Sequence, residues 1–374
     1  MNNAKRKTPK YQEIVGSLRR DFASGRFKPG ERIPSEAELT RRFKVSRMTA
    51  VKAIQQLQQE GLVMRRAGSG SFVAQSSEQT RRSFGLLIPD LGQTEIFEPI
   101  CRGMMRTPFG KDHSLLWGHA VWDDRNREVE AERLCRQFIE ARVSGVFFAP
   151  LEFSEHHGNM NQAILAAFND AGVPVVLLDR DVAAFPERSA YDLVCLDNRQ
   201  AGFVITRHMI EQGCKRIAFF ARKGSADTVE TRIAGYSEAL IFAGLFQDSL
   251  IVRGDASDAA FVSAEVVEKA VDGIVCANDF TAANMMQTLQ SLRLKVPDTI
   301  RLAGFDDVKY ARLLQIPLTT IHQPCAEIGA SAMAAMLERI DNPNLPGRLI
   351  QLRGELIIRE SSGANVGQHA EIKA

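Results

Sequence analysis

Residues 272–290, "DGIVCANDFTAANMMQTLQ", place a short apolar run directly before a polar pair and a helix-forming segment. The same alternation of apolar runs and helical segments continues through most of the chain. Short, nearly all-apolar strands bounded by helices indicate an α/β fold with parallel sheets that are covered on both faces. Strands are expected at 84–89, 114–120, 145–150, 174–179, 216–221, 273–278 and 300–305, and helices at 124–142, 198–212, 230–243 and 279–293.

Polar residues follow several of these strands at their carboxyl ends, which is where open α/β sheets bind ligands. They are Asp90, Glu152, Asp179, Asn278 and Asp306. A rim of carboxylates, an amide and one arginine, without a glycine fingerprint, favours a neutral polyhydroxylated ligand over a phosphate or a dinucleotide. Each sugar hydroxyl both donates and accepts hydrogen bonds, and these side chains together satisfy both roles.

The same segment does not point to catalysis or to metal binding. Asp306 and Asp307 are adjacent, but neighbours at the end of a strand point to opposite sides, so a glycosidase pair is not expected. His156 and His157 fall in a polar loop without a third ligand, and the six cysteines include no C-x-x-C pair. We therefore expect a binding protein with no catalytic residue, no metal and no cofactor.

The charge of the chain is unevenly distributed. Its 374 residues carry a net charge of +2, and this length predicts two or three cores. Residues 1–76 hold 16 Lys and Arg against 6 Asp and Glu, whereas the remaining residues hold 31 against 39. A small basic head on a larger acidic body indicates that only the head meets a polyanion. No apolar run is long enough to cross a bilayer and the basic N-terminus is not a secretory signal, so a cytoplasmic location is expected.

Three helices are expected in the head. Apolar residues recur at spacings of three and four over residues 10–24. Ser35 can cap a second helix, with Glu38 closing a capping box, and Ser46 can cap a third that ends before Gly61.

The third helix is expected to bury one face and expose the other. By helical spacing the residues that turn inward are Ala50, Ala53, Ile54 and Leu57, and those that turn outward are Met48, Lys52, Gln55 and Gln59. A polar, basic face so soon after a preceding helix is the layout of helix-turn-helix recognition.

A wing is expected to follow, because "LVMRRAGSGSFV" at residues 62–73 holds two β-like runs around a Gly-Ser-Gly turn. Residues 11–74 resemble the GntR-type winged helix over their whole length, including the entry "GRFKPGERIPSE", the turn "VSRMT" and the glycine-rich wing. The resemblance implies that Arg47 and Thr49 contact bases or phosphates, and an arginine there can fork onto guanine. The expected DNA-binding residues are Ser35, Ser46, Arg47, Thr49, Lys52, Arg65, Arg66, Gly68, Ser69 and Gly70.

The head departs from this family at two positions. The family often carries a basic residue at the positions of Ala37 and Val51, and both are apolar here. Val51 can either pack at the edge of the core or touch a thymine methyl. We therefore expect the base contacts of this helix to depend on Arg47 and Thr49, while Lys52 and the wing arginines hold phosphates.

The body resembles the LacI/GalR effector domain, a type I periplasmic-binding-protein fold, in "VPVVLLDR", "LDNRQAG", "KRIAFFA", "TRIAGY", "DGIVCANDFTA", "IRLAGFDD" and "LTTIHQP". The resemblance implies sugar contacts from Asp179, Arg232, Asn278, Asp306 and Gln323. It also implies that Arg232 grips the sugar and is the most damaging single residue to lose.

The resemblance leaves the aromatic platform of the sugar site open. Phe97 matches a position that lines the cleft, but Ala256 stands where the family commonly has a stacking aromatic residue. Phe97 or Trp122 is then a candidate platform, and for each the alternative is ordinary packing. Asp197 resembles a turn residue with a structural role.

A GntR-type reader joined to a LacI-type sensor is the layout of AraR-like carbohydrate regulators. We expect a winged helix-turn-helix domain at 1–76, a linker at 77–83, an effector domain at 84–360 and a polar tail at 361–374. The leading hypothesis is a homodimeric repressor, paired through the effector domain, that a small carbohydrate releases from a double-stranded DNA operator, with an inverted repeat as the expected form of the site.

The sequence leaves three alternatives open. The ligand could be a co-repressor that tightens DNA binding. The chain could be an enzyme of sugar metabolism with an attached DNA-binding head, or a binding protein whose head no longer reads DNA. The sequence does not identify the sugar, because pentose, hexose and uronate differ by one group.

Overall fold

The computed structural model describes residues 10–23, 26–28, 30–59, 62–66, 70–73, 81–88, 96–107, 110–118, 126–152, 157–184 and 186–364. The chain divides into two compact units, Met1–Arg81 and Arg82–Ala374, here called the head and the body. The division falls in the segment expected to be a linker. None of the helices in the described part of the chain combines the length and the apolar character needed to cross a membrane.

The head is a three-helix domain with a two-stranded wing. It holds α1 (Lys10–Ala23), α2 (Glu36–Phe43) and α3 (Arg47–Gln59), followed by β1 (Val63–Arg66) and β2 (Gly70–Val73), which pair antiparallel. The predicted capping box is present: the Glu38 backbone N–H donates to Ser35 Oγ, and the Ser35 backbone N–H donates to the Glu38 carboxylate. Lys44 ends α2 in the left-handed conformation at φ +50°.

The apolar face predicted on α3 packs into the core of the head. Ala50, Ala53, Ile54 and Leu57 are buried and pack with apolar residues of α1, α2, β1 and β2. The opposite face is open, since Met48 is 75% exposed. The prediction of which face of α3 is buried and which is exposed is therefore confirmed.

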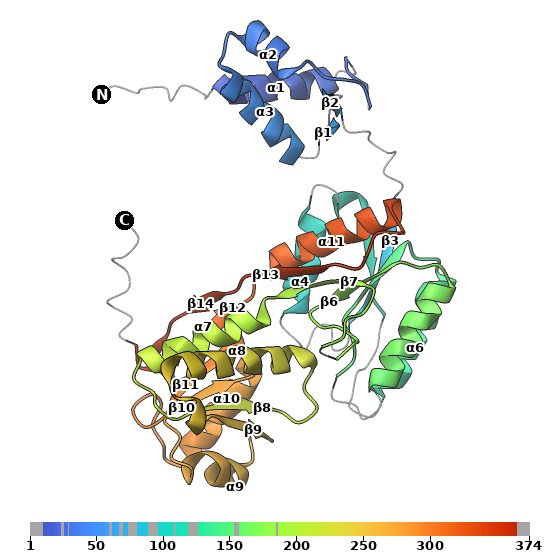
Figure 1. Cartoon of the computed structure of the whole chain (residues 1–374). Helices are drawn as coiled ribbons and strands as arrows, with labels where there is room; N and C mark the ends of the chain where they lie inside the picture. Colours follow the sequence, from blue (N-terminus) through green and yellow to red (C-terminus); the bar gives the residue numbers. More distant parts are fainter. Residues whose placement is uncertain are drawn as a thin grey trace, which may run out of the picture. The chain divides into compact units, whose positions relative to one another are not determined.

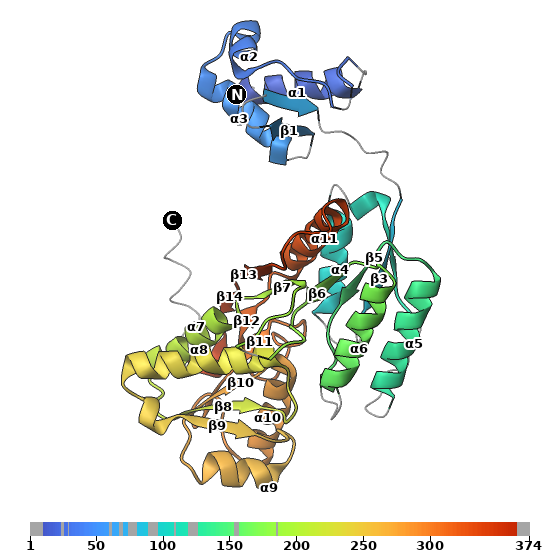
Figure 2. The same cartoon turned by 45° about the vertical axis from the view of Figure 1, so that its right-hand side comes forward.

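The body has two lobes, each built on a six-stranded sheet (Figures 1 and 2). The sheet of the first lobe has the order β13-β7-β6-β5-β3-β4 and is parallel throughout. Its strands are β3 (Ser83–Leu87), β4 (Ser114–Leu116), β5 (Gly145–Phe148), β6 (Val175–Leu178), β7 (Asp192–Leu196) and β13 (Leu349–Leu352).

The sheet of the second lobe has the order β14-β12-β11-β10-β8-β9 and is parallel except where β14 pairs with β12. Its strands are β8 (Ile217–Ala221), β9 (Leu250–Arg253), β10 (Gly273–Cys276), β11 (Arg301–Asp306), β12 (Thr319–His322) and β14 (Glu355–Ile357). The predicted α/β class with parallel sheets is confirmed.

Helices cover both faces of each sheet, as the all-apolar strands require. In the first lobe, α4 (Phe97–Arg106) and α11 (Cys325–Asp341) pack on one face, and α5 (Arg127–Glu140) and α6 (His157–Asp170) on the other. In the second lobe, α7 (Asn198–Glu211) and α8 (Asp227–Ala243) cover one face. The other face is covered by α9 (Ala259–Val262), a π-helical segment (Ser263–Val267) and α10 (Asp279–Ser291). Short 3₁₀ segments lie at Gly110–Asp112, Phe246–Asp248 and Glu360–Ser362.

The chain passes between the lobes three times within residues 186–364. It leaves the first lobe between β7 and α7, returns between β12 and α11, and leaves again between β13 and β14. At the third passage Gly354 leaves room for the other two, because a Cβ there would meet Ile321 Cγ2 at 2.6 Å and Leu196 Cδ1 at 3.1 Å. These connections run side by side and place the carboxyl ends of both sheets opposite each other.

Candidate functional site

The start of α3 is fixed by two hydroxyl groups. Ser46 Oγ accepts a hydrogen bond from the Thr49 backbone N–H at 3.3 Å and shares a second hydrogen bond with Thr49 Oγ1 at 2.9 Å. Ser46 is therefore the cap that the sequence predicted, and its hydroxyl also holds the side chain of Thr49. Both groups remain at the open end of the helix, where a recognition helix contacts DNA.

Glu36 brings together the predicted arginines of α3 and the wing. Its carboxylate lies 3.6 Å from Arg47 Nε and 3.4 Å from Arg65 Nη2. The Arg47 side chain is 83% exposed, so this ion pair adds little to stability and both guanidinium groups can turn to a polyanion. Sequence reasoning did not identify Glu36, although its place in the first turn of α2 is typical of an acidic residue.

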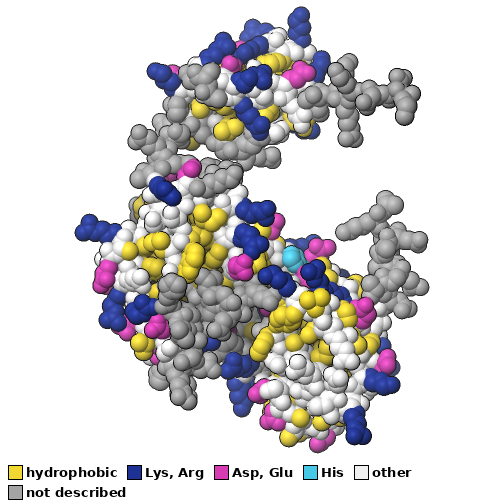
Figure 3. Space-filling model, turned by 180° about the vertical axis from the view of Figure 1, so that it is seen from behind, with side chains coloured by type: hydrophobic (Ala, Val, Ile, Leu, Met, Phe, Trp, Pro, Cys, Tyr) yellow, Lys and Arg dark blue, Asp and Glu magenta, His cyan; other side chains and the backbone are white. Residues whose placement is uncertain are grey.

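Lys52 has a second contact within the head. Its Nζ lies 4.5 Å from the centre of the Tyr11 ring, a cation–π geometry that ties α3 to α1. Lys and Arg side chains are spread over the face of the head seen in Figure 3. Ala37 is exposed and Val51 is half-buried, outside the buried cluster of the head, so the two family departures leave apolar side chains at this surface.

The wing turn depends on glycine. Gly70 has a φ of +107°, and a Cβ there would lie 2.9 Å from Arg32 Nε. A side chain at this position would therefore be strained and would have to displace Arg32. The side chain of Arg66, together with Gly68 and Ser69, lies outside the described residues.

The cleft between the lobes of the body is a cavity of about 510 Å³. Of the predicted ligand-binding residues, it is lined by Phe97, Glu152, Asp179, Arg232, Asn278 and Asp306. Asp90 lies outside the described residues. The remaining wall residues are Ile96, Arg127, Arg180, Arg222, Ser225, Thr228, Val229, Ala277, Phe280, Thr281, Val308 and Tyr310.

Arg232 is the buried cation of the second-lobe wall. Its side chain donates from Nε to Asn198 Oδ1 at 2.8 Å and from Nη1 to the Ala277 carbonyl at 2.5 Å. Its Nη2 lies 3.8 Å from Asp306 Oδ1, and the guanidinium stacks 4.6 Å from the Phe305 ring centre. With only 5% of the residue exposed, the group is fixed in position before a ligand arrives.

Asp306 faces Arg232, and the pKa of its carboxyl is shifted from the ordinary value. Burial raises its pKa to about 6, although Arg232 and the amide of Gln323 act to lower it. Its φ of +108° is a strained conformation for a residue with a side chain, and such strain gathers at functional sites. The carboxyl is therefore held where it can change its protonation close to neutral pH.

Gln323 supports Asp306 and does not line the cavity. Its Nε2 donates to Asp306 Oδ1 at 2.7 Å, and only 1% of the residue is exposed. The resemblance implied a direct sugar contact from Gln323. In this structure the residue instead orients the carboxyl that faces the cleft.

Asp307 points away from the cleft, as the alternation along a strand requires. Its two oxygens bind His322 Nδ1 at 3.0 Å and Arg359 Nη2 at 2.6 Å. The two adjacent carboxyls therefore have different partners, Asp307 in the salt bridges above and Asp306 beside Arg232. Among the described residues no group of three or more His, Cys, Asp or Glu side chains is placed to hold a metal ion.

The first-lobe wall contains a buried ion cluster in which Arg180, which was not predicted, joins the predicted Glu152 and Asp179. Arg180 pairs with Glu152 and lies 3.2 Å from Asp179 Oδ2. Burial would lower the pKa of its guanidinium, but the two carboxylates outweigh burial and raise it. Arg180 directly follows the predicted Asp179 in the sequence, so its position at the end of a predicted strand could have identified it as a cleft residue.

Asn278 and Asp197 each cap a helix, and Asn278 also lines the cleft. Asn278 Oδ1 accepts from the Thr281 backbone N–H at 2.8 Å and so begins α10, while its residue also lines the cavity. Asp197 Oδ1 accepts from the Gln200 backbone N–H at 3.1 Å at the start of α7. The structural role expected for Asp197 is confirmed.

One of the expected aromatic residues, Phe97, lines the cavity, and Phe280 lines it as well. Ala256 is 5% exposed and packs in the second-lobe core, and Trp122 lies outside the described residues. Phe97 lines the cavity but is 2% exposed, whereas Phe280 lines it and is 65% exposed. Phe280 therefore offers the more accessible ring face.

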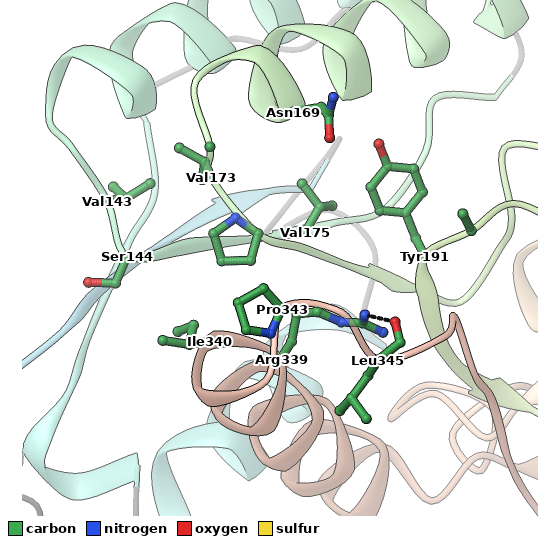
Figure 4. A pocket seen from close by; sticks show the side chains of 13 residues that line it. Val143, Ser144, Asn169, Val173, Val175, Tyr191, Arg339, Ile340, Pro343 and Leu345 are labelled. Atoms are coloured by element: carbon green, nitrogen blue, oxygen red, sulfur yellow. Dashed lines mark hydrogen bonds between the residues drawn. The ribbon is translucent and has the colours of Figure 1, made fainter.

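A second cavity of about 690 Å³ lies in the first lobe, at the end of its sheet opposite to the cleft (Figure 4). Its wall is mainly aliphatic and includes Val173, Val175, Ile340 and Pro343. The Arg339 guanidinium beside it is engaged by the Leu345 carbonyl and by Asp192. None of the predicted site residues lies there, so the cleft is the better candidate.

Comparisons with known proteins support both halves of this description. Residues 10–73 match the family model for bacterial regulatory proteins of the gntR family, and residues 206–362 match a periplasmic binding protein-like domain. The chain therefore joins a gntR-type DNA-binding domain to a periplasmic-binding-protein-like domain, and the resemblance found in the sequence is confirmed.

The similar proteins are transcriptional regulators. The arabinose metabolism transcriptional repressor of Geobacillus stearothermophilus is 28% identical over 368 residues, which cover 95% of this chain and 98% of that protein. The HTH-type transcriptional repressor PurR of Vibrio campbellii is 30% identical over 231 residues, 60% of this chain and 66% of that protein. A LacI family regulator from Enterococcus faecium, solved with bound ribose, has a TM-score of 0.60 at 21% identity and covers 75% of this chain and 98% of its own.

Proposed function

We infer that this chain, a gntR-type DNA-binding domain joined to a periplasmic-binding-protein-like domain, is a transcriptional repressor whose DNA affinity is controlled by a ligand in the cleft. The observation that carries the inference is the pairing of two sites: exposed Arg47 and Arg65 in the head, and the preorganised pair of Arg232 and Asp306 in the body. The regulators to which the chain is similar support the same reading and give no support to an enzyme.

We propose that the ligand is a small carbohydrate. The wall offers carboxylates, an amide, hydroxyls and guanidinium groups, which together donate to and accept from sugar hydroxyls. Phe280 adds an exposed ring against which a sugar face can stack. The regulator from Enterococcus faecium with bound ribose is an example of this fold holding such a ligand.

Ligand binding is proposed to change the angle between the two lobes. Two segments that connect the lobes contact the wall of the cleft, because Asn198 binds Arg232 and Gln323 binds Asp306. A ligand that bridges the lobes favours the closed form, and the connecting segments transmit the change.

We propose that the repressor acts as a homodimer paired through the body, on an operator with inverted repeats. Two heads must then fit major grooves about 34 Å apart or a multiple of that distance. A change in their separation weakens both half-site contacts, so the ligand is expected to release the operator. If the ligand tightens binding instead, it is a co-repressor acting through the same cleft.

The test is a thermal-shift screen of the full chain against pentoses, hexoses and uronates, followed by an operator titration with each hit. A ligand at 100 times its dissociation constant stabilises the protein by about 2.7 kcal/mol. We expect one narrow class of sugar to stabilise the body and to change operator affinity. If no carbohydrate does either, the proposal of a sugar-controlled repressor is wrong.

A further inference from the structure

Glu152 of the first lobe contacts the second lobe across the cleft. It follows β5, and its Oε2 accepts a hydrogen bond from the Ala226 backbone N–H at 3.1 Å. Ala226 is the N-cap residue of α8, and its own side chain forms no cap hydrogen bond. A carboxylate from the opposite lobe thus accepts from the N-cap backbone N–H, as a Glu or Gln at the third helical position does in a capping box; α8 has Val229 at that position.

The position of Glu152 is fixed from within its own lobe. Its other carboxylate oxygen pairs with the buried guanidinium of Arg180, which is held in turn by Asp179. The Glu152 side chain is 22% exposed, so most of its surface is buried. One carboxylate therefore joins a fixed cation of the first lobe to a helix end of the second lobe.

Elementary electrostatics favours this contact. The first N–H groups of an α-helix lack intrahelical acceptors, and the aligned peptide dipoles give that end a partial positive charge. Helix α8 has 17 residues and also carries Arg232. A hydrogen bond to an ionised carboxylate is stronger than one between neutral groups, so the contact fixes the helix that presents the main cation of the cleft.

We propose that Glu152 is a clasp that holds the two lobes together before any ligand binds, and that its role is this inter-lobe contact and not recognition of the ligand. The contact itself does not depend on the proposed function. Its regulatory consequence does rest on that function: the clasp sets the resting balance between open and closed lobes, from which a ligand shifts the protein. Without it, the ligand-free lobes spend more time apart.

The clasp can be tested by hydrogen–deuterium exchange on the full chain, without DNA or carbohydrate. Glu152→Ala is expected to speed exchange in peptides covering residues 222–230 about tenfold, the size that loss of one charge-assisted hydrogen bond gives. Glu230→Ala is the matched control, because it removes a carboxylate of α8 that pairs with Arg253 inside the second lobe. The control is expected to leave the exchange of Ala226 unchanged.

A second variant removes the donor and keeps the helix. Ala226 has a φ of −66°, which suits proline, and Ala226→Pro has no backbone N–H. In that background Glu152→Ala is expected to change the exchange of residues 227–230 less than about twofold, because both substitutions break one contact. Equal effects of Glu152→Ala in both backgrounds, or faster exchange throughout both lobes, would overturn the clasp. Because these measurements contain no ligand, a failed sugar screen leaves their result intact.

Discussion

Asn198 Oδ1 accepts a hydrogen bond from Arg232 Nε at 2.8 Å, which joins the first residue after one inter-lobe connection to a guanidinium in the cleft wall. The second connection reaches the same wall, because Gln323 donates to Asp306. Since Arg232 and Asp306 also face each other, two of the three connections meet at one ion pair. A ligand that binds this pair would therefore contact side chains that two of the connecting segments hold in place.

Arg232→Ala is therefore expected to remove the response to ligand. The substitution deletes the fork that holds Asp306 and the second-lobe side of the ligand, so affinity is expected to fall about 100-fold or more. Isothermal titration with the carbohydrate identified by the screen measures the loss. Arg199→Ala is the control, because Arg199 also joins α7 to α8, through Glu238, but its side chain is 63% exposed. Wild-type affinity in Arg232→Ala would show that the ligand binds elsewhere.

Asp306 is expected to make stability depend on pH. Its pKa is about 6 in the folded protein, above the ordinary value of 3.8, so the folded state holds this proton more tightly than the unfolded chain. The resulting stabilisation is complete below about pH 4 and is lost as the pH rises through about 6. The two values imply a change of roughly 3 kcal/mol.

Comparison with Asp306→Asn removes this carboxyl, and it also removes the negative charge that, after burial, helps to raise the pKa of Asp279, so the difference reports on both groups. Burial, the larger cause, raises the pKa of Asp279 well above the ordinary range. Urea unfolding of the body between pH 4 and 7 is expected to show the wild type losing stability relative to Asp306→Asn. A constant difference across that range would mean that Asp306 titrates normally.

The strands that the sequence predicted correctly include those buried on both faces, such as β5, β6, β8 and β10. The sequence did not predict β9, β13 and β14, which lie at sheet edges, are only three or four residues long and have mostly exposed or half-buried side chains. It also missed β7 and β12, which contain buried polar residues. Asp192 in β7 is neutralised by Arg339 and Arg348, and Thr320 in β12 donates to Asp279. Those partners are distant in the chain, so periodicity cannot reveal them.

The cleft was predicted in outline for a topological reason. Residues that follow parallel strands must gather at one edge, and this rule placed Glu152, Asp179, Asn278 and Asp306 correctly on the wall. It could not find Arg127 or Phe280, which reach the cavity from the starts of helices. Nor could it separate a ligand contact from a support: Glu152 binds a backbone N–H of the opposite lobe, and Gln323 binds the carboxyl of Asp306.

The wing is expected to fail if glycine is replaced at its turn. Gly70→Ala adds a Cβ 2.9 Å from Arg32 Nε at a φ of +107°, a conformation that costs an L-residue about 1–3 kcal/mol. We expect faster hydrogen exchange in β1 and β2 and weaker DNA binding, with an unchanged body. Gly158→Ala in α6 is the control, since a Cβ there would meet nothing within 4 Å. Normal DNA affinity in Gly70→Ala would show that the wing does not contribute.

Arg47 and Lys52 are expected to differ in what they contribute to DNA binding. Arg47 is 83% exposed at the start of α3, where a guanidinium can fork onto guanine, whereas Lys52 lies over Tyr11 and is suited to a phosphate. Arg47→Ala should erase the preference for operator over random DNA, a loss of about 1–3 kcal/mol of discrimination. Lys52→Ala should weaken binding to operator and random DNA alike, and should reduce the slope of log affinity against log salt concentration by about one.

Fluorescence anisotropy at several salt concentrations separates these two effects. Equal losses on operator and random DNA for Arg47→Ala would assign sequence reading to another residue. If the native chain itself showed no salt-dependent binding to duplex DNA, the head would not be a DNA reader at all.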